Sequence, residues 1–106
     1  MIIKKDAFIH HVFLWLKDAE RKEDLIKLID PLKKLCKVSV IKDFHIGKPA
    51  GTNRNVIDNT WSVSWLLLFE NADDQQMYQA DPIHLKFIEE CLHLWKSVVV
   101  YDTINY

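Results

Sequence analysis

The chain has 106 residues, of which 49% are hydrophobic and 27% are charged, and its formal net charge is −1. These values are typical of one compact soluble domain, so we interpret residues 1–106 as a single domain. The balanced charge, with no basic block, argues against nucleic acid as a partner. No run of about 18 apolar residues is present, so the sequence predicts no membrane-spanning helix and no membrane partner.

The start of the chain, from Met1 to Asp6, contains no apolar signal segment, which predicts a cytoplasmic location. Cys36 and Cys91 lie far apart and outside any CxxC pattern. We therefore interpret both as buried, small apolar side chains. The sequence has no HExxH motif, cysteine pair or carboxylate cluster with metal-ligand spacing, and we expect neither a metal nor another cofactor.

The first predicted element is a strand over residues 8–16, because nearly every position in FIHHVFLWL is apolar and many are β-branched or aromatic. Asp18 is the expected cap of the following helix, in which apolar residues recur at three- and four-residue spacing as far as Cys36. Pro31 interrupts this pattern. A proline inside a helix removes a hydrogen bond, so we expect a kink or a break near Asp30.

Two more strands are predicted on either side of a loop. Residues 40–47 alternate between apolar and polar side chains, as a half-exposed strand does. Residues 48–59 contain turn-forming Pro, Gly and Asn, and the length of this segment favours a flap over a site. The third strand, 61–69, is expected to present one apolar set to a single side: Trp61, Val63, Trp65, Leu67 and Phe69.

The last part of the sequence predicts a short helix over 73–79, a second helix that begins at Asp81-Pro82, and a strand over 98–106. Asp is a good N-cap, and Pro is favoured in the first turn of a helix. The second helix is expected to turn one stripe of side chains inward: Leu85, Ile88, Leu92 and Trp95.

The order strand, helix, strand, strand, helix, strand is that of α+β ferredoxin-like domains, in which a four-stranded antiparallel sheet carries both helices on one face. The first strand is nevertheless apolar on its other side, which includes Ile9, Phe13 and Trp15. At about 25 cal/mol per Å², leaving such a patch in water costs several kcal/mol, and such patches usually mark interfaces. We therefore expect a homodimer, a dimeric α/β barrel in which two sheet faces pack together.

Adjacent His10 and His11 must point to opposite faces of the first strand, so they do not chelate one metal together. Two interpretations of His10 remain open. It is either a core histidine hydrogen-bonded to the backbone, or a ligand-binding or proton-transfer group in a pocket between sheet and helices. His11 is assigned to the dimer face, and His93 to solvent.

The segment from Tyr78 to His84 is the most informative about function. With Asp81 as the N-cap, His84 is the third helical residue, where unpaired amides and the helix dipole favour a neutral imidazole. A neutral histidine accepts protons, and Tyr78 can donate a hydrogen bond to a developing enolate or phenolate oxygen. The structural alternative is that His84 closes the helix start and Tyr78 packs against the sheet.

Several segments resemble the stress-responsive dimeric α/β barrel family, known as Dabb. They are residues 10–17, 44–48, 69–70, 78–84 and 95–102. The Tyr78-Gln79 pair followed by Asp81-Pro82-Ile83-His84 is the most specific of them, and the resemblance covers nearly the full length. It implies the same ferredoxin-like fold and homodimer as the strand order and the apolar faces.

The resembled family includes a plant polyketide cyclase, olivetolic acid cyclase, which closes an aromatic ring with a tyrosine and a histidine. By motif position these residues correspond to Tyr78 and His84, and His10 matches a first-strand histidine that lines the cavity. Where the family often has a histidine this chain has Asp81, whose carboxylate would raise the pKa of His84. Pro31 is also unusual and would reshape one pocket wall.

Three functions remain open. The first is a dimeric protein that binds a small hydrophobic or aromatic compound between sheet and helices, with polar contacts from His10, Tyr78 and His84. The second is a cofactor-independent enzyme, similar to a polyketide cyclase or isomerase, in which His84 is the general base, Tyr78 stabilises an oxyanion and His10 orients. The third is a structural stress protein whose pocket is filled by its own side chains.

Overall fold

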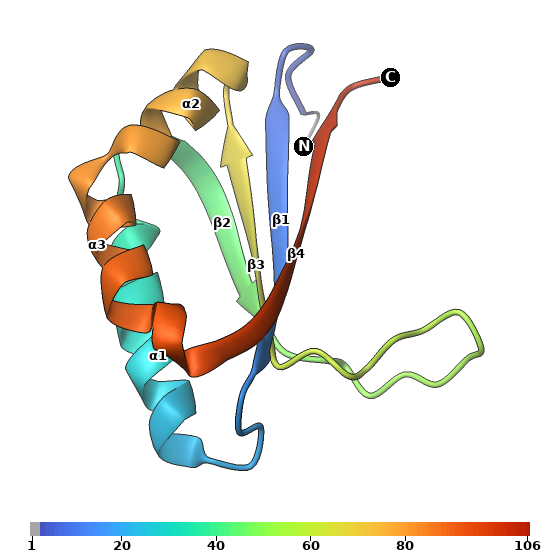
Figure 1. Ribbon diagram of the computed structural model, residues 1–106. Coiled ribbons are helices and arrows are strands. Elements are labelled where there is room, and N and C mark those ends of the chain that lie inside the picture. Colours follow the sequence, from blue (N-terminus) through green and yellow to red (C-terminus); the bar gives the residue numbers. More distant parts are fainter. Residues whose placement is uncertain (1–2) are drawn as a thin grey trace.

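The computed structural model describes residues 3–106, which form one antiparallel sheet with helices on a single face (Figure 1). The strands are β1 (Phe8–Leu16), β2 (Ile41–Gly47), β3 (Val63–Phe69) and β4 (Trp95–Ile104), in the order β2-β3-β1-β4. The helices are α1 (Lys22–Leu35), α2 (Ala72–Ala80), α3 (Pro82–Cys91) and the short 3₁₀ helix η1 (Leu92–Leu94). This arrangement confirms the predicted ferredoxin-like fold.

Strand β1 lies in the middle of the sheet, paired with β3 on one side and β4 on the other. Its alternate side chains divide between two faces. Val12 and Leu14 are buried under the helices, on what we call the closed face, whereas Phe13 and Trp15 are only partly buried on the opposite, open face. The bounds of β1 are those predicted, and the apolar character of both faces is confirmed.

The core lies between the closed face and helices α1 and α3. Its fully buried side chains include Leu28, Leu32, Leu35, Leu67, Phe69 and Cys91. The predicted stripe of α3 is partly wrong, because Leu85 and Leu92 are more than half exposed. The α3 side chains that pack against the core are Phe87, Ile88 and Cys91, of which only Ile88 belongs to the predicted stripe.

Helix α1 continues through Pro31, so of the predicted kink or break near Asp30 the break is wrong. Pro31 has no N–H to donate to the carbonyl oxygen of Lys27, one turn earlier. The thiol of Cys91, on α3, donates a hydrogen bond to that oxygen, with 3.8 Å between Sγ and O. The neighbouring helix thus replaces the lost donor, which is a tertiary contact that the sequence pattern does not contain.

The start of α1 also differs from the prediction. Arg21, not Asp18, occupies the cap position, and it makes no side-chain capping bond. Asp18 accepts a hydrogen bond from the N–H of Glu20 in the preceding turn, with 3.2 Å between the atoms. The carboxylate therefore stabilises the turn that leads into the helix and not the helix end itself.

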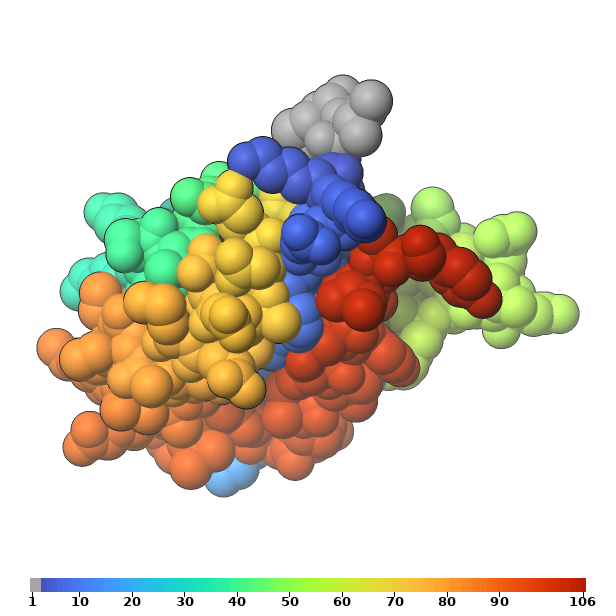
Figure 2. Space-filling model, turned by 90° about the horizontal axis from the view of Figure 1, so that it is seen from above, coloured from blue at the N-terminus to red at the C-terminus, as the bar shows by residue number. Residues whose placement is uncertain are grey.

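The long segment between β2 and β3 projects away from the helices, on the side of the open face (Figures 1 and 2). We call residues 48–60 the arm. Its tip is closed by a hydrogen bond from the N–H of Ile57 to the carbonyl oxygen of Arg54, 2.9 Å long. Its two branches are joined by a bond from the side-chain amide of Asn59 to the carbonyl oxygen of Thr52, 2.8 Å long. The arm is therefore a folded projection.

Trp61 lies at the base of the arm and not in β3. Its ring packs edge-on against Phe13 on the open face, with ring centroids 5.2 Å apart. The prediction that Trp61 shares a side with Val63 is therefore wrong, because the strand pattern begins only at Val63. Within residues 3–106, no helix has the length and apolar character needed to cross a membrane.

Candidate functional site

A hollow of about 200 Å³, here called the site hollow, lies between the closed face and helices α2 and α3. It brings together the three predicted site residues, His10 from β1, Tyr78 from α2 and His84 from α3. The rest of its wall is mainly apolar and consists of Val12, Trp65, Phe87, Ile88, Trp95, Val98 and Val100, with Gln79 at the edge. The three side chains that the sequence singled out therefore line one hollow.

One side of the site hollow is open. Val98 and Val100 of β4 pair with Leu14 and Val12, so they point to the closed face, yet they are 44% and 45% exposed. β4 is an edge strand of the sheet, so within residues 3–106 no further strand lies beyond it (Figure 1). The hollow therefore opens sideways along β4.

His10 is buried, and its Nδ1 lies 2.6 Å from Oδ1 of Asp102. The two residues are opposite each other in the register of β1 and β4. A carboxylate can only accept a hydrogen bond, so Nδ1 carries the proton and Nε2 keeps a free lone pair when the ring is neutral. His10 is thus a satisfied buried histidine, but its partner is a side-chain carboxylate and not the backbone.

Tyr78 is 1% exposed and stands between the two histidines. Its ring centroid lies 5.8 Å from that of His10 and 4.6 Å from that of His84. Burial, with a smaller effect of the Cys36 thiol, raises the pKa of Tyr78, and the Trp65 indole acts weakly against this. The hydroxyl of Tyr78 therefore stays protonated at neutral pH and is available as a donor.

His84 is the third residue of α3, as predicted, and Asp81 caps this helix by accepting a bond from the N–H of Ile83 (2.8 Å). Nδ1 of His84 donates to the carbonyl oxygen of Gln79, 3.0 Å away, which leaves Nε2 free. Burial lowers the pKa of His84, and nearby His10 adds to this. The Gln79 bond and the Asp81 charge raise that pKa but are outweighed, so the imidazole is neutral.

Two functional groups in this region were missed from the sequence. Asp102 is the last residue of the segment 95–102 that resembles the family, and its pairing with His10 depends on the register of β4. An acidic residue among the β-branched residues of a terminal strand was the available signal. The second group is the buried indole Nε1 of Trp65, which has no well-formed hydrogen bond to any residue in 3–106. No sequence pattern indicated it.

Other features of the chain do not contribute to the site hollow. No residue of the arm lines it, so the arm is not a flap over this site. Larger hollows, of about 460 and 380 Å³, lie near the chain ends and contain exposed lysines and acids but no histidine. Within residues 3–106, no three His, Cys, Asp or Glu side chains are arranged to hold a metal ion.

The family model described as Stress responsive A/B Barrel Domain (Dabb) matches residues 8–105. No curated protein matches the chain at a significant level. Solved structures resemble it over nearly its whole length. One is a dimeric protein of unknown function with a ferredoxin-like fold from Bacteroides fragilis, 23% identical, covering 94% of this chain and 97% of that chain, with a TM-score of 0.71.

Two further structures are similar in the same way. A Dabb family protein with a ferredoxin-like fold from Mesorhizobium loti is 18% identical, with 94% and 97% of the two chains covered and a TM-score of 0.78. A hydroxynitrile lyase from Passiflora edulis is 18% identical, with 97% and 96% covered and a TM-score of 0.79. At these identities the likeness establishes the fold and not the chemistry.

Proposed function

Because the chain belongs to the stress-responsive α/β barrel (Dabb) family, we propose that it is a homodimer whose subunits each bind a small hydrophobic or aromatic compound in the site hollow. The apolar open face supports the dimer, since Phe13 and Trp15 remain partly exposed in a single chain. The similar protein from Bacteroides fragilis is described as dimeric. The cytoplasm is the proposed location, because Cys36 and Cys91 are separate, buried thiols.

The observation that carries the binding proposal is the convergence of His10, Tyr78 and His84 on one apolar hollow. Ligand sites typically combine apolar walls with a few well-placed polar groups. An apolar cavity of about 150 Å³ is enough to hold benzene, so a hollow of about 200 Å³ fits a single ring with small substituents. An acceptor on such a compound would also satisfy the buried indole of Trp65.

The binding proposal is tested by titrating substituted phenols and aromatic aldehydes while tryptophan fluorescence is recorded, because Trp65 and Trp95 both line the hollow. Val100→Trp should plug the open side and weaken binding at least tenfold. Leu85→Trp, on the exposed surface of α3, is the matched control and should leave affinity unchanged. Equal binding by both variants, or no binding of any compound at millimolar concentration, contradicts the proposal.

A second candidate is a cofactor-independent enzyme for an aldol-type cyclisation, an isomerisation or a decarboxylation. It is favoured by the neutral, half-buried His84 and by the 2.6 Å pairing of His10 with Asp102. Nε2 of His84 would remove a proton from carbon next to a carbonyl. The enolate oxygen formed would accept a hydrogen bond from the Tyr78 hydroxyl, while His10, fixed by Asp102, would orient the compound.

One substitution separates the two candidates. His84→Ala should change ligand affinity by less than about tenfold if the site only binds. It should reduce turnover by 10²- to 10⁴-fold if His84 is the base, which is the usual contribution of general base catalysis. Titration and product analysis on the same protein preparation give both readings.

The homodimer has its own test. Light scattering at micromolar concentration should give a mass of about twice 12.6 kDa. A mass of one chain at that concentration contradicts the dimer. The binding proposal is then still tested separately, by the titration described above.

A further inference from the structure

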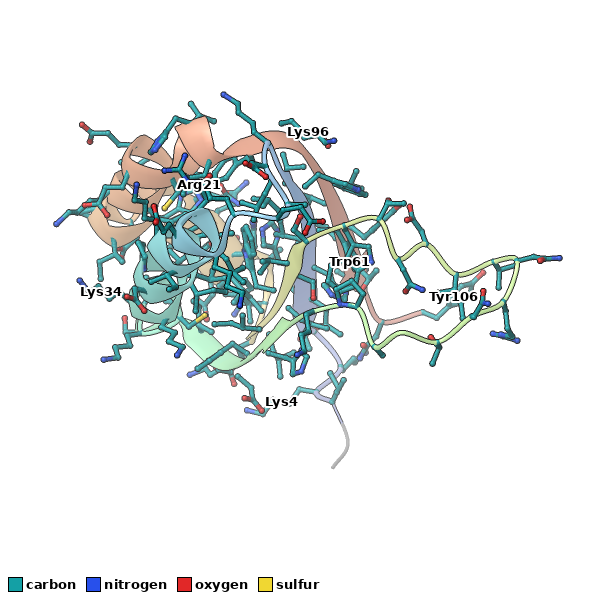
Figure 3. The ribbon with its side chains drawn as sticks, turned by 90° about the horizontal axis from the view of Figure 1, so that it is seen from below. Lys4, Arg21, Lys34, Trp61, Lys96 and Tyr106 are labelled. Atoms are coloured by element: carbon teal, nitrogen blue, oxygen red, sulfur yellow. The ribbon has the colours of Figure 1, made fainter. Side chains whose placement is uncertain are left out.

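The arm is folded, and it projects from the sheet (Figure 1). It leaves the sheet on the open-face side, and Figure 3 shows it extending beyond Trp61, away from the helices. Val56 near its tip is 82% exposed. Packed sheets lie about 10 Å apart, so a long projection on the packing side of one sheet must pass beside the sheet of a second copy.

A second hollow, of about 240 Å³, lies at the base of the arm on the open face, and we call it the aromatic hollow. It is lined by Phe13, Trp15, Asp58, Trp61, Val99 and Tyr101. Phe13 meets the rings of Trp61 and Tyr101 edge-on, at centroid distances of 5.2 and 6.1 Å. Aromatic faces arranged around a carboxylate attract cations.

The carboxylate of this hollow is fixed in place. Both the N–H and the hydroxyl of Thr60 donate to Oδ1 of Asp58, and these bonds lower the pKa of Asp58. The indole N–H of Trp15 donates in turn to the Thr60 hydroxyl oxygen, 2.9 Å away. The chain of bonds holds a negative charge beside the aromatic side chains and ties the arm base to β1.

We propose that, in the homodimer, the arm of each copy reaches across the other and places Arg54 in the aromatic hollow, next to Asp58 of that second copy. This inference rests on the homodimer proposed above. It adds the arm as a second contact between the two copies, besides the packing of their open faces. It requires the two-fold axis to run roughly along the strands, which brings both arms to the same end of the dimer.

Charge and position favour Arg54 as the occupant. Arg54 lies at the arm tip and has no acidic partner among residues 3–106. The other arginine, Arg21, lies among the helices (Figure 3) and is already 3.3 Å from a carboxylate oxygen of Glu23. A guanidinium also stacks on aromatic rings and pairs with carboxylates better than an ammonium does.

The sharpest test mixes two singly changed chains, Arg54→Glu and Asp58→Arg. Each alone should dimerise at least tenfold more weakly, because each homodimer then sets like charges together. Mixed, they should form heterodimers selectively, since both arm contacts again join opposite charges. Mass spectrometry of intact complexes, with one chain isotopically labelled, counts the species. A contact within one chain cannot produce this rescue.

The control mixture is Arg21→Glu with Asp58→Arg, which should show no selective heterodimer. A second measurement covers the case in which Asp58→Arg disorders the arm. Arg54→Cys and Asp58→Cys chains, mixed and treated with a short bis-maleimide, should cross-link between copies. A dimeric wild type that shows neither selective pairing nor cross-linking overturns this inference alone, whereas a monomeric wild type overturns it together with the proposed homodimer.

Discussion

The two faces of the sheet differ in how far this chain's own helices cover them, and β1 contributes side chains to both. On the closed face, His10 is buried, paired with Asp102 and next to Tyr78. On the open face, neighbouring His11 is only partly buried and its ring lies 4.3 Å from that of Phe13. The closed face is completed by this chain's own helices, whereas the open face has no cover within residues 3–106. Adjacent residues in one strand thus line the site hollow on one face and the proposed dimer interface on the other.

The largest effect is expected from a charge on the open face. Trp15→Glu places a carboxylate where the proposed dimer buries an indole, and it also removes the indole bond to Thr60. The dimer should be lost completely at micromolar concentration in light scattering. Leu85→Glu, on the exposed surface of α3, is the control and should remain dimeric. If the Trp15→Glu variant remains dimeric, the dimer interface does not lie on the open face around Trp15.

A matched pair of leucines in β3 compares the faces directly. Leu67 is fully buried on the closed face, and Leu66, next to it, is partly buried on the open face. Leu67→Ala should lower the free energy of unfolding by about 2–5 kcal/mol, because it leaves a cavity in the core. Leu66→Ala should lower it far less in dilute protein and mainly weaken the dimer. Urea unfolding at several protein concentrations separates these outcomes.

Asp102→Asn tests the site on the closed face with less disturbance. An amide can still hydrogen-bond to His10, but it no longer favours the Nδ1–H tautomer by charge. We expect ligand affinity or turnover to fall by about 10- to 100-fold, by analogy with the partners that orient metal-binding histidines. Asp43→Asn, on exposed β2, should change neither quantity. If Asp102→Asn leaves both ligand affinity and turnover unchanged, the pairing of His10 with Asp102 has a structural role only.

The smallest expected effect is on pH dependence. Burial lowers the pKa of His84 below its ordinary value of 6.5, so between the two values the unfolded chain binds a proton that the folded chain does not. The free energy of unfolding should therefore fall as pH drops below about 6.5. His84→Asn should reduce this slope, measured by urea unfolding between pH 7.5 and 5. An unchanged slope would assign the acid sensitivity to other groups, such as His11, whose pKa burial also lowers.

Local patterns predicted the parts of the molecule that depend on neighbours in sequence. The apolar, β-branched run set the bounds of β1, and Asp81-Pro82 set the start of α3. The spacing from Tyr78 to His84 also placed both residues at the site hollow, since a helix cap and one turn determine their relation. Cys36 and Cys91 are buried as expected.

The errors concern contacts between elements that are distant in sequence. The break predicted near Pro31 is wrong because α1 continues there, and the thiol that replaces the missing donor comes from α3. The role of Asp102 could not be derived, because a shift of β4 by one residue would turn its side chain to the other face. Leu85 fits a helical repeat as well as Phe87 does. Which of the two is buried depends on which side of α3 faces the sheet, and this is set by tertiary packing.

The uncovered side of β4 has a consequence for kinetics. Val98 and Val100 leave a lateral opening to the site hollow, so the compound proposed to bind there would enter and leave without displacement of a helix. Association should then follow a single phase whose observed rate rises linearly with ligand concentration, with no plateau from a slow opening step.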